Sequence, residues 1–83
     1  MRAQDVLADH QNEIEIQGTT VRKGTVGAFL ANARRLQAAP AGTPRDAVLQ
    51  DIAALLPALQ ALGLFDVLQI RDPQLRAFVE ARL

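Results

Sequence analysis

The chain contains 83 residues, of which nine are basic, nine acidic and none cysteine, so its formal net charge is zero. This length suits a single domain, and the absence of cysteine excludes disulfide bonds and thiolate chemistry. A neutral charge balance argues against a general binder of polyanions. The hydrophobic content of 49% predicts a folded chain, stabilised by its own apolar side chains or by a second copy.

The charges are unevenly distributed along the sequence. Residues 1–16 have a net charge of −3, residues 17–45 carry five basic and no acidic residues, and residues 46–83 have a net charge of −2. These charges either mix on the folded surface or form a dipolar surface that self-associates or meets an anion. The sequence shows no signal peptide, and its longest apolar stretch is broken by Pro57 and Gly63, so we expect a cytoplasmic protein without a membrane span.

Residues 1–12 are polar and predict a mobile N-terminal arm or one short helical turn. Within residues 13–23, Ile14 and Ile16 alternate with Glu13, Glu15 and Gln17, which is typical of a half-buried strand. A turn at Gln17-Gly18 would place Glu13 opposite Arg22 and gather the apolar side chains on one face. We therefore predict a two-stranded antiparallel hairpin.

Three helices are predicted after the hairpin. The first covers about 25–38, with Thr25 as its N-cap and an apolar stripe of Val26, Phe29, Leu30, Ala33 and Leu36. The second covers about 44–62, with Thr43 as its N-cap, Pro44 at the first helical position, a kink at Pro57 and Gly63 as its C-terminal cap. The third covers about 73–82 and is capped by Asp72.

The segment 64–70 fits either a short helix or a strand, because its apolar run is too short for periodicity to decide. The predicted fold class is therefore α+β: one small hairpin packed on three main helices. We expect the apolar ridges 26–36 and 48–62 to clasp the sheet and to leave no room for a reactive pocket.

The sequence GTTVRKGTVG, residues 18–27, is the candidate for a phosphate site. A P-loop places its lysine after the second glycine, whereas Lys23 precedes Gly24 here. A weaker possibility is an anion held by the helix N-terminus at Thr25, flanked by Arg22 and Lys23. The interpretation we favour is structural, with Gly24 as a turn and Thr25 as a cap.

Other chemistry finds little support in the residue types. His10 is the only histidine and has only Asp9 and Glu13 close by in sequence, a poor set of metal ligands, so we expect no metal and no cofactor. The chain also lacks serine and tyrosine, and no catalytic pair is evident, so we expect no enzymatic activity. Arg34 and Arg35 could contact phosphates, but the few aromatic residues make nucleic acid an unexpected ligand.

A two-stranded hairpin is marginal in water, so the chain must bury it on the helices or gain strands elsewhere. We therefore expect a homo-oligomer or a complex with another protein, formed either by two hairpins or by leftover leucines between helices. The leading functional hypothesis is a non-catalytic protein-interaction module. The alternative is anion or nucleic-acid binding through the basic segment 17–45.

Two segments carry a resemblance. VRKGTVGAFLAN (21–32) and LPALQALGLFDVL (56–68) resemble parts of a family of small, uncharacterised bacterial proteins that share a G-T-V-x-x-x-L-x-N helix start and a later P-x-L-x-x-x-G-L-F-D segment. The resemblance implies no activity. It implies a helical turn at G-L-F-D, supports the joint between hairpin and helix, and adds Asn32 and Asp66 as interaction or structural candidates. Asn32 alone is expected to tie down a loop or strand end by a hydrogen bond.

Overall fold

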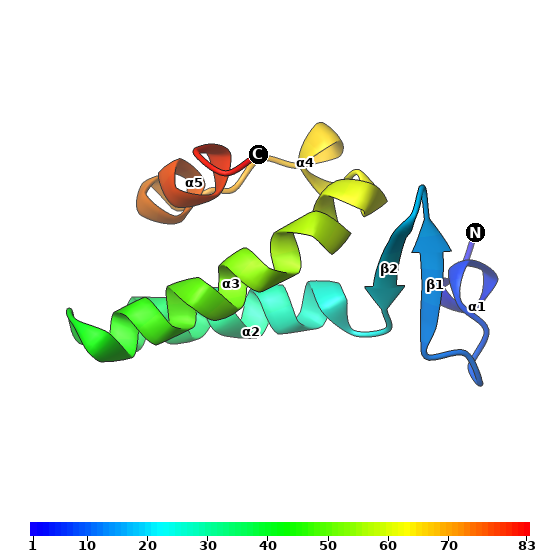
Figure 1. The fold of residues 1–83 in the computed structure, drawn as a ribbon, viewed down its shortest axis with the longest axis horizontal. Helices are drawn as coiled ribbons and strands as arrows, with labels where there is room; N and C mark the ends of the chain where they lie inside the picture. Colours follow the sequence, from blue (N-terminus) through cyan, green and yellow to red (C-terminus); the bar gives the residue numbers. More distant parts are fainter.

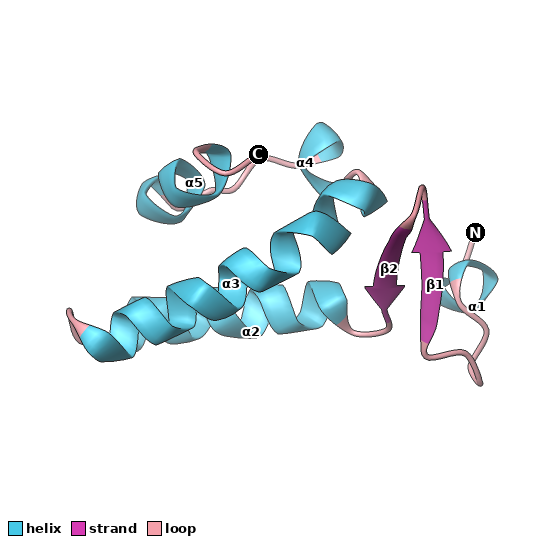
Figure 2. Cartoon of the chain, viewed as in Figure 1, coloured by secondary structure: helices cyan, strands magenta, loops and turns pink.

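The computed structural model describes residues 1–83. Its elements are arranged as a hairpin followed by a helical layer (Figure 1, Figure 2). In chain order they are α1 (Ala3–Val6), β1 (Glu13–Ile16), β2 (Thr19–Arg22), α2 (Thr25–Ala38), α3 (Thr43–Leu62), α4 (Leu64–Val67) and α5 (Pro73–Glu80). The long helices α2 and α3 pack against each other, and the hairpin extends from one end of the pair. The α+β fold class is confirmed.

The hairpin has the predicted register. Glu13 pairs with Arg22 and Ile16 with Thr19, so the strands turn at Gln17-Gly18. Both turn residues have positive φ, 49° and 81°, as a type I′ turn requires, and this turn matches the twist of the two strands. Val21 is buried on the side facing α3, and the two isoleucines of β1 are half-buried.

The predicted N-caps of the first two long helices are wrong by one residue. Gly24, with φ of 89°, precedes α2, so Thr25 already lies inside the helix. The Thr25 hydroxyl instead donates a hydrogen bond to the Arg22 carbonyl oxygen at 2.6 Å. The turn from β2 into α2 uses a residue with positive φ, and glycine adopts that conformation without strain. Gly42 likewise precedes α3, and Thr43 is helical.

Helix α3 runs without a break through Pro57, as predicted. Proline leaves the carbonyl four residues earlier without its helical partner, but Pro57 lies on the exposed side, where water can take that place. Gly63 then ends the helix with φ of 78°, and its N–H donates to the carbonyls of Leu59 and Gln60. The predicted C-terminal cap is confirmed.

The core lies between the three main helices. Its eight buried members come from one side of each helix and are Phe29, Leu36, Val48, Ile52, Leu56, Leu59, Leu75 and Val79. The hairpin contributes only Val21, which lies outside this cluster. The expectation that the helical ridges clasp the sheet is therefore wrong. The ridges of α2 and α3 bury each other and α5, and the sheet sits at their end.

The ambiguous segment 64–70 is a single helical turn, α4, followed by a non-helical connection, Leu68–Arg71. The next helix has the predicted cap, because the Asp72 carboxylate accepts a hydrogen bond from the Leu75 N–H at 2.8 Å. Helix α5 ends at Glu80, two residues earlier than predicted. Beyond it, the Arg82 guanidinium lies 3.6 Å from the centre of the Phe78 ring. None of the helices combines the length and apolar character needed to cross a bilayer.

Replacing Leu59 by alanine should lower the free energy of unfolding by about 3 kcal/mol, because a fully buried leucine leaves a cavity in a close-packed core. Urea denaturation followed by circular dichroism measures the change. Leu62→Ala is the matched control on the same helix. Leu62 is 36% exposed, so its truncation should cost clearly less. Equal losses for the two variants would contradict this core.

Replacing Asp72 by alanine should lower the free energy of unfolding by about 1 kcal/mol, because the N-terminal N–H of α5 loses its acceptor. Asp72→Asn keeps a cap oxygen and should recover most of the loss. The comparison is again made by urea denaturation. A loss as large in the asparagine variant as in the alanine variant would show that the cap is not what Asp72 contributes.

Candidate functional site

The structure uses two of the basic-segment candidates to hold its own chain. The Lys23 ammonium donates hydrogen bonds to the carbonyls of Ala8 and Asp9, at 3.1 and 2.9 Å, and its backbone N–H donates to Asn12. These contacts fasten the N-terminal segment, including the one-turn helix α1, to the end of the hairpin. Thr25 is buried and bonds back to β2, so its hydroxyl faces the protein rather than a ligand.

Arg34 and Arg35 lie in the other half of α2. They are nine and ten residues beyond Thr25, or about 14 Å along a helix with a rise of 1.5 Å per residue. Both are exposed, and an Arg35 guanidinium N–H donates to the Asn32 side-chain oxygen at 3.3 Å. Asn32 thus meets a side chain on its own helix rather than a loop or strand. The structure does not bring the four basic candidates to one place.

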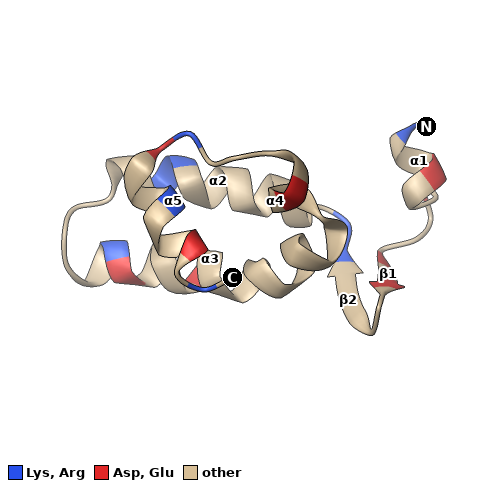
Figure 3. Ribbon diagram, turned by 90° about the horizontal axis from the view of Figure 1, so that it is seen from above, with Lys and Arg blue, Asp and Glu red and all other residues tan.

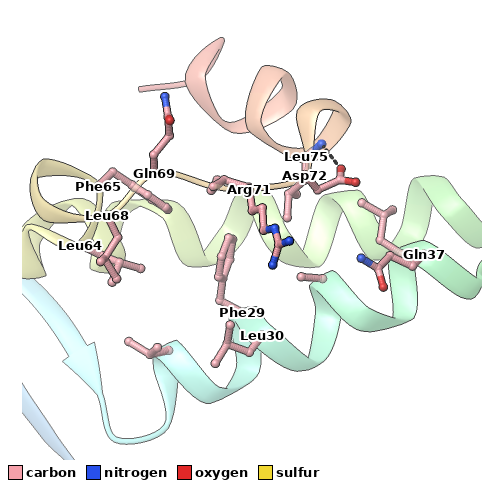
Figure 4. Close-up of a pocket in the computed structure, with 14 residues that line it drawn as sticks. Phe29, Leu30, Gln37, Leu64, Phe65, Leu68, Gln69, Arg71, Asp72 and Leu75 are labelled. Carbon is pink, nitrogen blue, oxygen red and sulfur yellow. Dashed lines mark hydrogen bonds between the residues drawn. The ribbon is translucent and has the colours of Figure 1, made fainter.

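An apolar groove lies between α2 and the chain that runs from α4 to the start of α5 (Figure 4). Its volume is about 360 Å³, and ten of its fourteen lining residues are hydrophobic. The helical ridges therefore leave more open space than the sequence indicated, in the form of a mostly apolar groove. The groove exists because Leu68–Arg71 is non-helical and lies beside α2 without filling the space between them.

The floor of the groove is formed by core side chains. Phe29, Leu36 and Leu75 are buried beneath it, and the Phe65 ring meets the Phe29 ring edge-on with centroids 5.9 Å apart. The aromatic pair fixes α4 on α2, since edge-to-face packing adds to the burial of the two rings. The floor is therefore a packed apolar surface.

The rim of the groove exposes large apolar side chains. Leu30 of α2 is 57% exposed, and Leu68 on the opposite wall is 59% exposed. Val26 continues the α2 rim by one turn and is also exposed. Exposed leucines on both sides of an apolar hollow are typical of a surface that another molecule covers.

Polar groups occupy the end of the groove near the start of α5. Figure 4 shows the Arg71 guanidinium reaching from the connection into the hollow. Asp72 is its neighbour, but that carboxylate is turned to the Leu75 N–H. Asp66, the other candidate from the resemblance, is exposed on α4 at the opposite end and does not line the hollow. The groove is therefore an open apolar surface with one cation directed into it.

The sequence pattern assigned Leu30 and Val26 to the core, and it did not single out Leu68 or Arg71. The width of the apolar stripe on α2 could have indicated that some of its residues lie outside the core. Leu30 lies about 100° around the helix from Phe29, too far for both to face α3. Arg71 carried no signal, because its direction depends on the path of a non-repetitive connection. Comparison of the chain with models of protein families, with curated proteins and with solved structures finds no match.

Replacing Lys23 by glutamine should loosen residues 3–11, because its ammonium makes two of the hydrogen bonds that join this segment to the hairpin. The expected result is a drop in the ¹⁵N heteronuclear NOE of those residues, with the helical core unchanged. Arg22→Gln, at the neighbouring exposed position, is the control and should leave the segment as it is. Unchanged NOE values in the Lys23 variant would contradict the fastening role.

Proposed function

We propose that this chain is a non-catalytic interaction module that self-associates through the groove between α2 and α4. The observation that carries the proposal is the exposed area. The molecule exposes 5968 Å², whereas a monomeric protein of 9.0 kDa exposes about 4,900 Å² by the usual scaling of surface with mass. It is also elongated, 39 × 24 × 22 Å. A chain this small leaves a surplus of surface that a second chain can cover.

Most of the large exposed apolar side chains within the helical layer lie at one end of it. Its members come from the start of α2, the end of α3, and α4 with the residue that follows it, and they are Val26, Leu30, Leu62, Val67 and Leu68. These elements lie together at the hairpin end of the molecule (Figure 1). Three of the side chains, Val26, Leu30 and Leu68, line the hollow that runs along α2.

A second copy of the chain suits this surface in size and shape. Stable complexes cover about 800 Å² on each partner, which is within the surplus of about 1,100 Å². A ridge beside a hollow is self-complementary, because a two-fold axis places the Leu30 ridge of each copy in the hollow of the other. Zero net charge also means that two copies do not repel each other as whole molecules.

Binding of phosphate groups by the basic segment 17–45 has less support. Lys23 and Thr25 bond within the chain, and Arg34 and Arg35 lie about 14 Å away on α2. The two hypotheses differ in salt dependence. Phosphate binding weakens steeply as salt rises, whereas burial of leucines does not.

Sedimentation equilibrium at tens of micromolar should give twice the monomer mass of 9.0 kDa, and Leu30→Glu should return the chain to the monomer. A buried glutamate would lose its hydration in the contact, whereas in the monomer this side chain is 57% exposed and the fold is unaffected. Circular dichroism checks the fold. A wild-type chain that stays at 9.0 kDa would overturn the proposal.

Val6→Glu is the matched control, because Val6 is 43% exposed but lies on α1, beyond the hairpin. It should associate like the wild type. Dissociation by Val6→Glu and not by Leu30→Glu would place the contact at the hairpin end and overturn the assignment to the groove. The measurement is repeated in high salt, where loss of all association would favour an electrostatic contact.

A further inference from the structure

We infer that the two copies lie antiparallel across the groove, with Asp66 of each copy facing Arg71 of the other. This inference rests on the proposed self-association and specifies its geometry. It comes from two exposed charges at opposite ends of the groove: Arg71 lines the end towards α5, and Asp66 lies on α4 at the other end, outside the lining.

The walls of the groove carry very few charges. Helix α2 has no acidic residue, and Asp66 is the only carboxylate between Asp51 and Asp72. Asp66 lies on α4, at the hairpin end, whereas Arg71 lies at the far end of the connection, towards α5. Figure 3 shows, from above, an acidic residue on α4, basic residues on α2, and a basic and an acidic residue side by side on the connection near α5.

Arg34 strengthens the basic end. It follows Leu30 by four residues and therefore shares that side of α2, next to the rim of the groove. Arg35 follows Val26 by nine residues, or two and a half turns, so it projects from the opposite side of the helix. Asp72 lies at the same end and keeps its negative charge while it accepts the N–H of Leu75. With Arg34 and Arg71 against Asp72, the local charge at this end is still positive.

Neither Asp66 nor Arg71 makes a side-chain hydrogen bond within its own chain. The side-chain hydrogen bonds of this region belong to Arg35, Arg45, Asp72 and Arg76, and neither Asp66 nor Arg71 takes part in them. Both residues are exposed. An arginine that reaches into an apolar hollow without a partner accepts a carboxylate readily, because its planar guanidinium can form two parallel hydrogen bonds.

The two groups do not pair within one copy. Asp66 lies on α4, Arg71 lies at the end of the non-helical connection Leu68–Arg71, and no side-chain hydrogen bond joins them. A two-fold axis through the middle of the groove reverses its direction and places each Asp66 over the partner's Arg71. A parallel arrangement would instead set arginine against arginine, which is unfavourable.

The test uses Asp66→Arg and Arg71→Glu, separately and mixed. Each variant alone sets like charges against each other at both contacts, so its dimer dissociation constant should rise at least about tenfold. An equimolar mixture should recover wild-type affinity. In the mixed dimer the introduced arginine faces the introduced glutamate, and the other contact keeps the natural Asp66–Arg71 pair. Sedimentation equilibrium with one variant labelled by a fluorophore measures both quantities.

Asp51→Arg and Arg35→Glu are controls that make the same charge changes away from the groove, on α3 and on the outer side of α2. They should associate like the wild type and should show no preference for mixed dimers. If the wild type and all four variants dimerise alike, the antiparallel pairing is overturned while self-association stands. If the single variants dissociate but the mixture does not recover, the two charges do not face each other. A monomeric wild type overturns both proposals.

Discussion

The length of α5 is the constraint on which the arrangement of the molecule depends. Helix α3 has 20 residues and spans about 30 Å, whereas α5 has eight and spans about 12 Å, so one short helix cannot cover the α2–α3 layer. It seals the region around Ile52 and Val79, which are almost completely buried. The rest of the layer is covered by the single turn of α4 and by an extended connection. Extended chain covers less area than a helix, and the groove is the space left over.

Sequence reasoning predicted the parts of the fold that depend on periodicity and on local turn chemistry. The alternation of residues 13–16, the positive-φ turn at Gln17-Gly18 and the Asp72 cap act over a few residues, so their signals are complete in the sequence. Continuity through Pro57 was predictable because the apolar stripe keeps its phase on both sides of the proline. The N-caps failed because glycine and threonine stand side by side, and only the path of the chain decides which residue turns and which begins the helix.

The candidate site was less predictable, for a physical reason. An apolar stripe on a helix indicates which side chains avoid water. It does not indicate whether those side chains are covered by the same chain or by another. Val26 and Leu30 are apolar residues on the same helix stripe as the buried Phe29 and Leu36, and they differ in having no helix above them. The direction of Arg71 is set by the connection after α4, which has no periodic signal. Lys23 shows the opposite case. It was a candidate for anion binding, but its side chain holds the N-terminal segment.

Stability and association are coupled in a chain of this size. Only ten of 83 residues are buried, so the core alone gives a modest free energy of unfolding, and any partner that binds the folded state adds to it in proportion to the logarithm of its concentration. The groove side chains are the ones that such a partner would shield. The short α5 therefore has two effects at once, since the apolar layer that it leaves open lowers the stability of the monomer and supplies the surface for the dimer that we propose. A longer α5 that closed the groove would strengthen the fold and remove the contact that we propose for its function.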